Sequence, residues 1–248
     1  MMCKCQVWQK NKETGRYFLR PCGQCLACRI NDTRDWFVRS HFEMKKLERP
    51  FHYFLTLTYD DEHLPEDGLC HKEDLKKFLN NLNTSFGLKM RYFATSDYGT
   101  INNRAHYHVI ILSSCKVTSA QINRIWKKGF IYLKACNPQN VKYTLRYTVK
   151  KKPFEKGDTR NFRLISKGWG DNVAKYYSGQ EFFVIDGKKY RIPEYCCQKI
   201  GIDKPEIITY SSVESSILNC PDYYKKTGSD ESWAEEMEKL VQYRRLLK

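Results

Sequence analysis

Residues 104–112 read Arg-Ala-His-Tyr-His-Val-Ile-Ile-Leu, and the fold is best derived from this stretch. An apolar run rich in β-branched side chains indicates a buried strand. Side chains alternate across a strand, so His106 and His108 project from one face, while Tyr107 and Val109 project from the other. Two imidazoles side by side can share a metal ion. The alternative is a pair of hydrogen-bonded histidines near the end of a strand.

A second strand is expected over residues 51–59, where aromatic and β-branched residues dominate. Phe54, Thr56 and Thr58 would share one of its faces. Turn-forming residues follow, and over 74–82 leucines and a phenylalanine recur at helical spacing. This part of the chain therefore predicts a strand followed by an amphipathic crossover helix.

The next strand is expected to bring a carboxylate to the histidines. Residues 90–96 predict a strand that is interrupted at Asp97, and a polar loop leads from there into the His-containing strand. Strands joined in this way are natural antiparallel neighbours, so Asp97 should return beside the two imidazoles. Further on, 119–126 predicts a short helix ended by Gly129, and 130–134 predicts a short edge strand.

Two tyrosines share one face of a later predicted helix. Asn137 and Pro138 supply an N-cap and a first-turn proline, a start signal for a helix over 139–151. Tyr143 and Tyr147 are four residues apart and so lie on one face. The core can be packed without these phenols, because the helix has an apolar stripe about 200° away. This stripe consists of Val141, Leu145 and Val149.

The N-terminal segment carries closely spaced cysteines. Cys22, Cys25 and Cys28 are separated by two residues each and are introduced by proline and glycine, a pattern that can wrap a loop around one ion. Cys3 or Cys5 is the candidate fourth ligand. We expect a structural Zn²⁺ here, with unligated thiols as the alternative. An iron–sulfur cluster is disfavoured because the ferredoxin pattern needs a fourth cysteine followed by proline.

Charge and composition limit the partners. Lysine and arginine number 43 against 28 acidic residues, which gives a formal charge of +15. This excess favours a polyanion, most commonly nucleic acid. A membrane partner is disfavoured, because we find no basic amphipathic helix with a clean apolar face and no apolar stretch of bilayer length. The N-terminus lacks the apolar core of a signal peptide, so we expect a soluble protein whose eleven cysteines remain thiols.

At 248 residues the chain is long enough for one large domain with appendages. A charged helix is expected from about residue 28 to 49. A hairpin through Asp186-Gly187 and a terminal helix over 231–247 are expected towards the C-terminus. The expected divisions are a Cys-rich segment with a helix over 1–50, a core over 51–152 and a C-terminal extension over 153–248.

The motifs follow the order apolar strand, acid, His-x-His and helical Tyr-x3-Tyr-x2-Lys. In this order they resemble the HUH endonucleases that start rolling-circle replication, with motifs at 54–58, 106–108 and 143–150. The Pro-Cys-Gly-Gln-Cys-x2-Cys-Arg and Leu-Thr-Leu-Thr-Tyr-Asp-Asp-Glu-His-Leu-Pro segments narrow the resemblance to replication initiators of gokushovirus-like microviruses, phages with single-stranded DNA. The resemblance implies an α+β fold, with a central antiparallel sheet flanked by helices (ferredoxin- or RRM-like) and a Cys-rich N-terminal segment.

The resemblance also implies an enzyme that nicks single-stranded DNA at a replication origin and later rejoins the strand. Tyr143 or Tyr147 would attack, assisted by Lys150, which leaves a 5′-phosphotyrosine link and a free 3′-hydroxyl. A Mg²⁺ or Mn²⁺ ion would polarise the phosphate. Its expected ligands are Asp97, His106 and His108. The residues expected to bind the nucleic acid are Arg146, Lys151 and Lys152.

Two positions depart from the family's pattern. Asp97 stands where a glutamate often sits, and Arg146 replaces the lysine often found between the tyrosines. Arginine keeps the charge but cannot donate a proton at neutral pH. The implied partners are single-stranded DNA at an origin and the host replication machinery, with no membrane and no small-molecule ligand. The implied location is the cytoplasm of an infected bacterial host.

Two alternatives remain open. A non-catalytic protein with a zinc-stapled N-terminus could present sheet aromatics to single-stranded nucleic acid. It accounts for the charge and the cysteines but leaves the histidines and tyrosines as coincidence, and metal-dependent cleavage of an oligonucleotide would exclude it. A transposase of the same nuclease fold, usually with one tyrosine, is the other alternative, and specificity for transposon-end hairpins would favour it.

Overall fold

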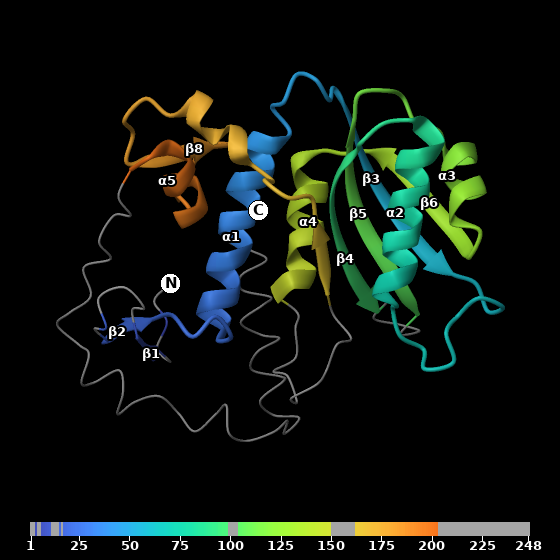
Figure 1. Ribbon diagram of the computed structural model, residues 1–248, viewed down its shortest axis with the longest axis horizontal. Helices are drawn as coiled ribbons and strands as arrows, with labels where there is room; N and C mark the ends of the chain where they lie inside the picture. The colour runs from blue at the N-terminus through green and yellow to red at the C-terminus, as the bar shows by residue number, and fades with distance from the viewer. Residues whose placement is uncertain are drawn as a thin grey trace. The chain divides into compact units, whose positions relative to one another are not determined.

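The computed structural model describes residues 3, 6–10, 15, 17–98, 104–149 and 162–202, without the side chains of 17–19 and 147–149. Figure 1 labels most of the helices and strands. In chain order the elements are β1 (Val7–Lys10), β2 (Tyr17–Arg20), α1 (Leu26–Glu43), β3 (Phe51–Tyr59), α2 (Lys72–Phe86), β4 (Arg91–Tyr98), β5 (Ala105–Ser113), α3 (Ser119–Trp126), β6 (Gly129–Ala135), α4 (Pro138–Val149), β7 (Arg163–Ile165), the 3-10 helix η1 (Asp171–Tyr176), β8 (Phe182–Ile185), β9 (Lys188–Arg191) and α5 (Glu194–Ile200).

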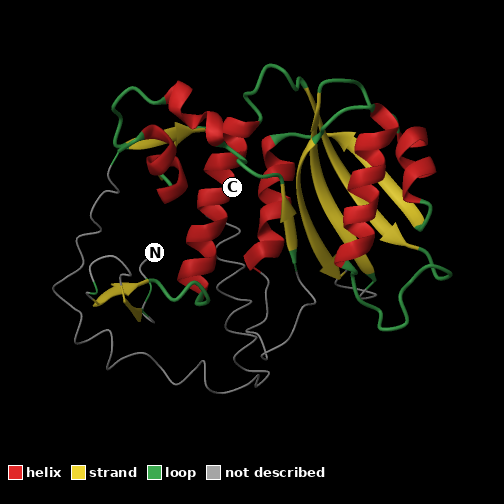
Figure 2. Cartoon of the chain, in the orientation of Figure 1, coloured by secondary structure: helices red, strands yellow, loops and turns green. Residues whose placement is uncertain are grey.

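Five of the strands form one antiparallel sheet in the order β6-β3-β5-β4-β7, flanked by helices (Figure 2). The succession β3-α2-β4-β5-α3-β6 is the βαββαβ arrangement of ferredoxin-like folds. β5, which carries His106 and His108, is the central strand and pairs with β3 and β4. The expected α+β class and the expected pairing of the two strands are therefore confirmed.

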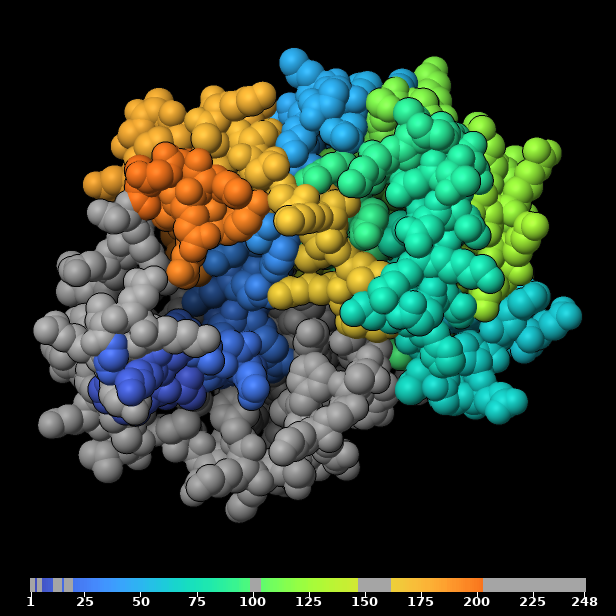
Figure 3. Space-filling view, in the orientation of Figure 1, coloured from blue at the N-terminus to red at the C-terminus, as the bar shows by residue number. Residues whose placement is uncertain are grey.

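One face of this sheet packs against α2 and α3. Leu55, Tyr107 and Val109 point to that side and join a buried cluster with Leu75 of α2 and Trp126 of α3. Burial of such apolar surface stabilises the fold by roughly 25 cal/mol per Å². The space-filling view shows α2 and the segment before it covering this side of the sheet (Figure 3).

The opposite face packs against α4 and carries the histidines. Phe93 and Ile110 of the sheet are buried in a cluster with Val141 and Leu145 of α4. The apolar stripe predicted on this helix is thus buried at two of its three positions, and the third side chain, Val149, lies outside the description. Because α4 is seated through this stripe, its other faces remain available.

The start of α4 follows the predicted capping signal. The Asn140 amide donates to the Asn137 side-chain oxygen (2.9 Å), and the Asn137 amide donates to the Asn140 side-chain oxygen (3.2 Å). This reciprocal pair satisfies amides that have no partner within the helix. The helix begins at Pro138 as expected.

Three predicted boundaries were wrong. α1 ends at Glu43 instead of residue 49, because the Lys45 and Lys46 amides bond to carbonyls three residues back and tighten the last turn. β4 continues through Asp97 and Tyr98 because both pair with β5. α3 ends at Lys127, whose φ is 52°, and not at Gly129.

Gly129 opens β6 instead of ending α3. Its φ is +129°, and a Cβ there would lie 2.3 Å from the Asp60 amide nitrogen. Glycine is therefore required for the close backbone approach at this end of the sheet.

The predicted hairpin forms between β8 and β9. Asp186 and Gly187 both have positive φ, 51° and 71°, as a two-residue type I′ turn requires. The helix expected over 231–247 lies outside the described residues.

The chain divides into two compact units. One comprises residues 1–32, 152–157 and 206–248, and its described part holds the β1–β2 hairpin. The other comprises 33–151 and 158–205 and holds the five-stranded sheet. None of the described helices has both the length and the apolar character needed to cross a membrane.

Candidate metal and tyrosine site

The register of β4, β5 and β3 gathers three metal-binding side chains. Asp97 lies directly opposite His106, and His108 lies opposite Thr56. The Nε2 atoms of the two histidines are 3.1 Å apart, and Asp97 Oδ2 is 3.5 Å from His106 Nε2. All three candidate ligand atoms lie within 4.8 Å of one another. The shorter aspartate therefore reaches the imidazoles from the neighbouring strand.

Hydrogen bonds at the far ring nitrogens orient both imidazoles. His106 Nδ1 donates to the Arg104 carbonyl oxygen at 2.9 Å, and this partner can only accept. His108 Nδ1 lies 3.2 Å from the Thr56 hydroxyl. Each ring thus turns Nε2 towards the other ring and towards the carboxylate. Metal-binding histidines in proteins are commonly fixed in this manner.

The backbone that carries the ligands is held from behind. The Cys70 thiol donates to the carbonyl oxygens of His106 (3.3 Å) and Asp97 (3.7 Å). Burial raises the pKa of Cys70 to about 12, so the thiol remains protonated and able to donate. On the other side, the Arg104 guanidinium binds the Tyr59 carbonyl at 2.9 Å and forms an ion pair with Asp61.

The ligand set suits a divalent cation. An octahedral ion about 2.1 Å from its ligands separates adjacent ligands by about 3.0 Å, and a tetrahedral one by about 3.4 Å. The observed 3.1 and 3.5 Å fit both geometries. Asp97 and His108 are 8% and 3% exposed, so few water molecules compete with these ligands. Two nitrogens and one carboxylate oxygen suit several divalent metals.

One of the two predicted tyrosines lies beside these ligands. The Tyr143 ring of α4 packs edge-on against His108, with centroids 5.2 Å apart, and against Phe54. Tyr143 remains 39% exposed. Tyr147 lies one turn further along α4, but its side chain is outside the description, as are residues Lys150, Lys151 and Lys152. The described residues provide no hydrogen-bond partner for the buried Nε of Arg146.

Sequence reasoning missed two groups of residues here. Phe54 stacks on the His108 ring with centroids 5.5 Å apart, and Thr56 bonds to it; their face was predicted, but their contacts depend on strand register. Phe130 and Tyr132 of β6 are 64% and 57% exposed. Alternation along the predicted edge strand could have placed them on one face.

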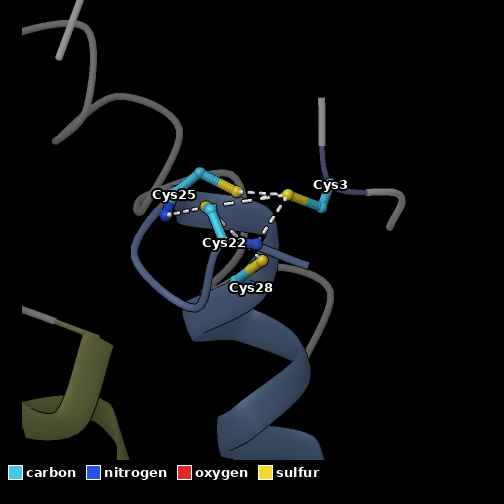
Figure 4. Close-up of side chains that lie close together, drawn as sticks. All are labelled: Cys3, Cys22, Cys25 and Cys28. Atoms are coloured by element: carbon cyan, nitrogen blue, oxygen red, sulfur yellow. Dashed lines mark hydrogen bonds between the residues drawn. The ribbon is translucent and has the colours of Figure 1, made fainter. Parts of the chain in front are cut away.

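The structure also brings four of the five candidate zinc ligands together. Cys3, Cys22, Cys25 and Cys28 form a second group that could hold a metal ion (Figure 4). Cys5, the other candidate for the fourth position, lies outside the described residues.

Residues 52–152 match a family model of replication-associated proteins, described by its member ORF2. The replication-associated protein ORF2 of Spiroplasma virus 4 is 30% identical over 213 residues, which are 71% of this chain and 65% of that protein. The replication-associated protein VP4 of Bdellovibrio phage phiMH2K is 32% identical over 211 residues, 72% of this chain and 66% of that protein. This chain belongs to the phage replication-associated proteins.

A third member of the replication-associated proteins, ORF4 of Chlamydia phage 1, is 24% identical over 83% of this chain and 61% of its own length. The chain thus spans about two thirds of the length of these relatives. The family expected from the motifs is confirmed. The span matched by the replication-associated family model contains Asp97, His106, His108 and both tyrosines of α4.

Proposed function

We propose that this protein initiates phage rolling-circle replication by nicking single-stranded DNA at an origin and rejoining it, with tyrosine as the nucleophile. The observation that carries the proposal is a juxtaposition of side chains. The ligand atoms of Asp97, His106 and His108 converge within 4.8 Å, and the Tyr143 ring lies against His108. A DNA phosphodiester resists attack because it is anionic, so its oxygens must be neutralised next to the nucleophile. This arrangement suits that task.

The three side chains would hold Mg²⁺ or Mn²⁺. When bound, the ion supplies a Lewis acid that withdraws charge from the scissile phosphate. Asp97 offers a carboxylate oxygen, and each histidine offers its Nε2 atom, because its other nitrogen is engaged by Arg104 or Thr56. These hydrogen bonds keep the donors in place before DNA arrives, which lowers the reorganisation that binding requires.

The covalent step exchanges one phosphate ester for another. The phenolic oxygen of Tyr143 or Tyr147 forms a bond to phosphorus, the bond from phosphorus to the 3′ oxygen breaks, and the phenolic proton ends on that oxygen. The products are a 5′-phosphotyrosine and a free 3′-hydroxyl that can prime synthesis by the host replication machinery. Phenols have a reference pKa of about 10, so cations are needed to favour the phenolate. Lys150 and Arg146 are the proposed sources of that charge.

Rejoining reverses the exchange. A 3′-hydroxyl attacks the phosphotyrosine, the strand is restored and the phenol regains its proton. Tyr143 and Tyr147 are four residues apart on one helix face. The second tyrosine could therefore cut a newly made junction while the first still holds the old end, which suits repeated cycles in the cytoplasm of an infected bacterium.

The open part of the same sheet face supports single-stranded DNA as the substrate. Phe130 lies opposite Thr58, which lies opposite His106; Tyr132 lies opposite Thr56, which lies opposite His108. Opposed side chains in an antiparallel pair share a face. Both aromatics therefore lie on the histidine face, about 10 Å across the sheet from the histidines. α4 packs over β4 and β5, and the two rings are exposed.

Charge complements these rings. The Lys134 ammonium lies 5.7 Å from the Tyr132 ring and 5.3 Å from the Phe54 ring, between the aromatics and the metal ligands. Unpaired bases stack on exposed aromatic rings while lysine binds the phosphates. We propose that the strand enters the site across Phe130 and Tyr132.

The test of the chemistry uses the full-length chain, Mn²⁺ and circular single-stranded DNA of random sequence, because the origin sequence is unknown. We expect DNA fragments that remain attached to protein in detergent, and sequencing them identifies the cleavage site. Tyr143→Phe and Tyr147→Phe should each retain single cleavage, while the double variant and His108→Ala should form no adduct.

Four results would contradict this proposal. An adduct formed by the double Phe variant would refute the tyrosine assignment. Cleavage without any adduct would indicate a nuclease that uses water. Salt-sensitive binding without cleavage would favour the non-catalytic binder. Products restricted to transposon-end hairpins would favour the transposase.

The DNA path has its own test. Stacking contributes about 1–3 kcal/mol per base, so Tyr132→Ala should weaken binding of an unpaired oligonucleotide roughly 5- to 150-fold. Tyr132→Phe is the matched control, because it keeps the ring and should bind as the wild type does. Lys134→Ala should reduce the salt dependence of binding. Equal binding by Tyr132→Ala and Tyr132→Phe would exclude this path.

A further inference from the structure

Four cysteine sulfurs converge where the N-terminal hairpin meets the start of α1 (Figure 4). Cys3 Sγ lies 3.6 Å from Cys22 Sγ and 3.7 Å from Cys25 Sγ, and the Sγ atoms of Cys22 and Cys28 are 3.9 Å apart. A disulfide would bring two sulfurs to about 2.05 Å. These cysteines are therefore thiols.

The spacing of the sulfurs matches a metal tetrathiolate. In a tetrahedral zinc site each sulfur lies about 2.3 Å from the ion, which places the sulfurs about 3.8 Å from one another. The three observed separations, 3.6, 3.7 and 3.9 Å, bracket this value. Cys25 and Cys28 are buried and the other two are partly buried, as in the closed structural sites of zinc proteins.

Backbone amides point at the sulfurs. The amides of Gln24 and Cys25 donate to Cys22 Sγ at 3.4 and 3.3 Å, and the Cys22 amide donates to Cys3 Sγ at 3.4 Å. Gly23 has a φ of +76°, which lets the chain turn tightly enough for these bonds. Hydrogen bonds of this kind favour the thiolate over the thiol, and the thiolate is the form that binds metal.

The hairpin explains why the fourth ligand comes from so far away in sequence. Val7 pairs with Arg20, so the chain enters and leaves the β1–β2 hairpin at the same end. Cys3 lies just before that end and Cys22 just after it. Cys28 lies in the first turn of α1, where the helix dipole also favours a thiolate.

This segment has little apolar burial of its own. The described β1 side chains are exposed, and Trp8 is 58% exposed. Within the described residues, both large buried clusters are built from residues beyond position 35. A short segment without a core commonly depends on a metal for its folded state.

We propose that Cys3, Cys22, Cys25 and Cys28 bind one Zn²⁺ as four thiolates and so close the N-terminal hairpin onto the start of α1. Zinc binding releases the four thiol protons, which leaves a site with a net charge of −2. All-sulfur ligands select zinc over Mg²⁺ and Mn²⁺, which prefer oxygen. The zinc site is therefore chemically separate from the Asp97 site and does not depend on the proposed nicking activity.

The test is the metal content of the full-length chain, measured by elemental mass spectrometry after purification under reducing conditions. We expect one zinc per chain in the wild type and in a His106→Ala/His108→Ala double variant. Cys25→Ser should lose the zinc, and Cys115→Ser, a matched change at a cysteine outside the cluster, should retain it. Cys3→Ser should also lose it, while Cys5→Ser should retain it.

A second measurement serves if the Cys25 variant fails to fold. In the wild type, a thiol reagent should modify four more cysteines after a strong zinc chelator is added than before. Folded protein without zinc, zinc retained by Cys25→Ser, zinc lost from Cys115→Ser, or iron in place of zinc would each overturn the proposal. A Cys22–Cys25 disulfide in reduced preparations would do so as well.

Discussion

Replacing Thr56 by valine isolates the contribution of one hydrogen bond to metal binding. The Thr56 hydroxyl lies 3.2 Å from His108 Nδ1. The corresponding partner of His106 is the Arg104 backbone carbonyl, which no substitution removes. Valine keeps the branched shape that strands favour, so the change deletes the hydroxyl and leaves β3 intact.

The expected magnitude follows from the role of such partners. Loss of a hydrogen bond to a metal-binding histidine typically lowers metal affinity 10- to 100-fold, which is about 1.4–2.8 kcal/mol. His108 is only 3% exposed, so water cannot readily replace the hydroxyl and we expect the larger effect. The Kd for Mn²⁺ should therefore rise towards 100-fold. DNA cleavage should return at saturating Mn²⁺, because the ligands themselves are unchanged.

Paramagnetic resonance of free Mn²⁺ gives the Kd directly. Thr58→Val is the matched control, because Thr58 lies on the same face of β3, two residues further along, opposite His106. An unchanged Kd in Thr56→Val would refute the reasoning. An equal rise in Thr58→Val would do the same, because the effect would then come from general loss of polarity at β3.

Three further predictions concern the scaffold. Gly129→Ala should cost well over 1 kcal/mol in the free energy of unfolding, measured in urea, because a Cβ would lie 2.3 Å from the Asp60 amide nitrogen; Gly179→Ala, where a Cβ meets nothing within 4 Å, should cost clearly less. Leu145→Ala should cost about 2–5 kcal/mol in the same assay, because Leu145 is fully buried under α4, whereas Leu47→Ala at a 92% exposed position should change little. Cys70 should resist iodoacetamide at pH 8 in the native chain, because burial raises its pKa to about 12 and the reactive thiolate forms only above that pH; rapid alkylation without unfolding would contradict this.

Much of the fold could be predicted from local patterns. Alternation over 51–59 and 104–112 assigned the faces of β3 and β5, and the Asn137-Pro138 signal placed the start of α4. These patterns succeed because strand and helix periodicities are set by the backbone of each segment. The ends of elements were less accessible. Asp97 belongs to β4 only because β5 pairs with it, and α1 stops early because its last turn tightens.

The amino-acid sequence by itself determined which residues could do chemistry: the His-x-His pair, the tyrosines at helical spacing and the clustered cysteines. Their types and spacings follow from local geometry. Only the tertiary structure decided that the shorter Asp97 reaches His106, that Thr56 orients His108, and that Cys3 joins the cysteine cluster. Those contacts depend on strand register and hairpin closure, which bring together residues far apart in the chain, and a register shift of one residue would turn each side chain to the opposite face.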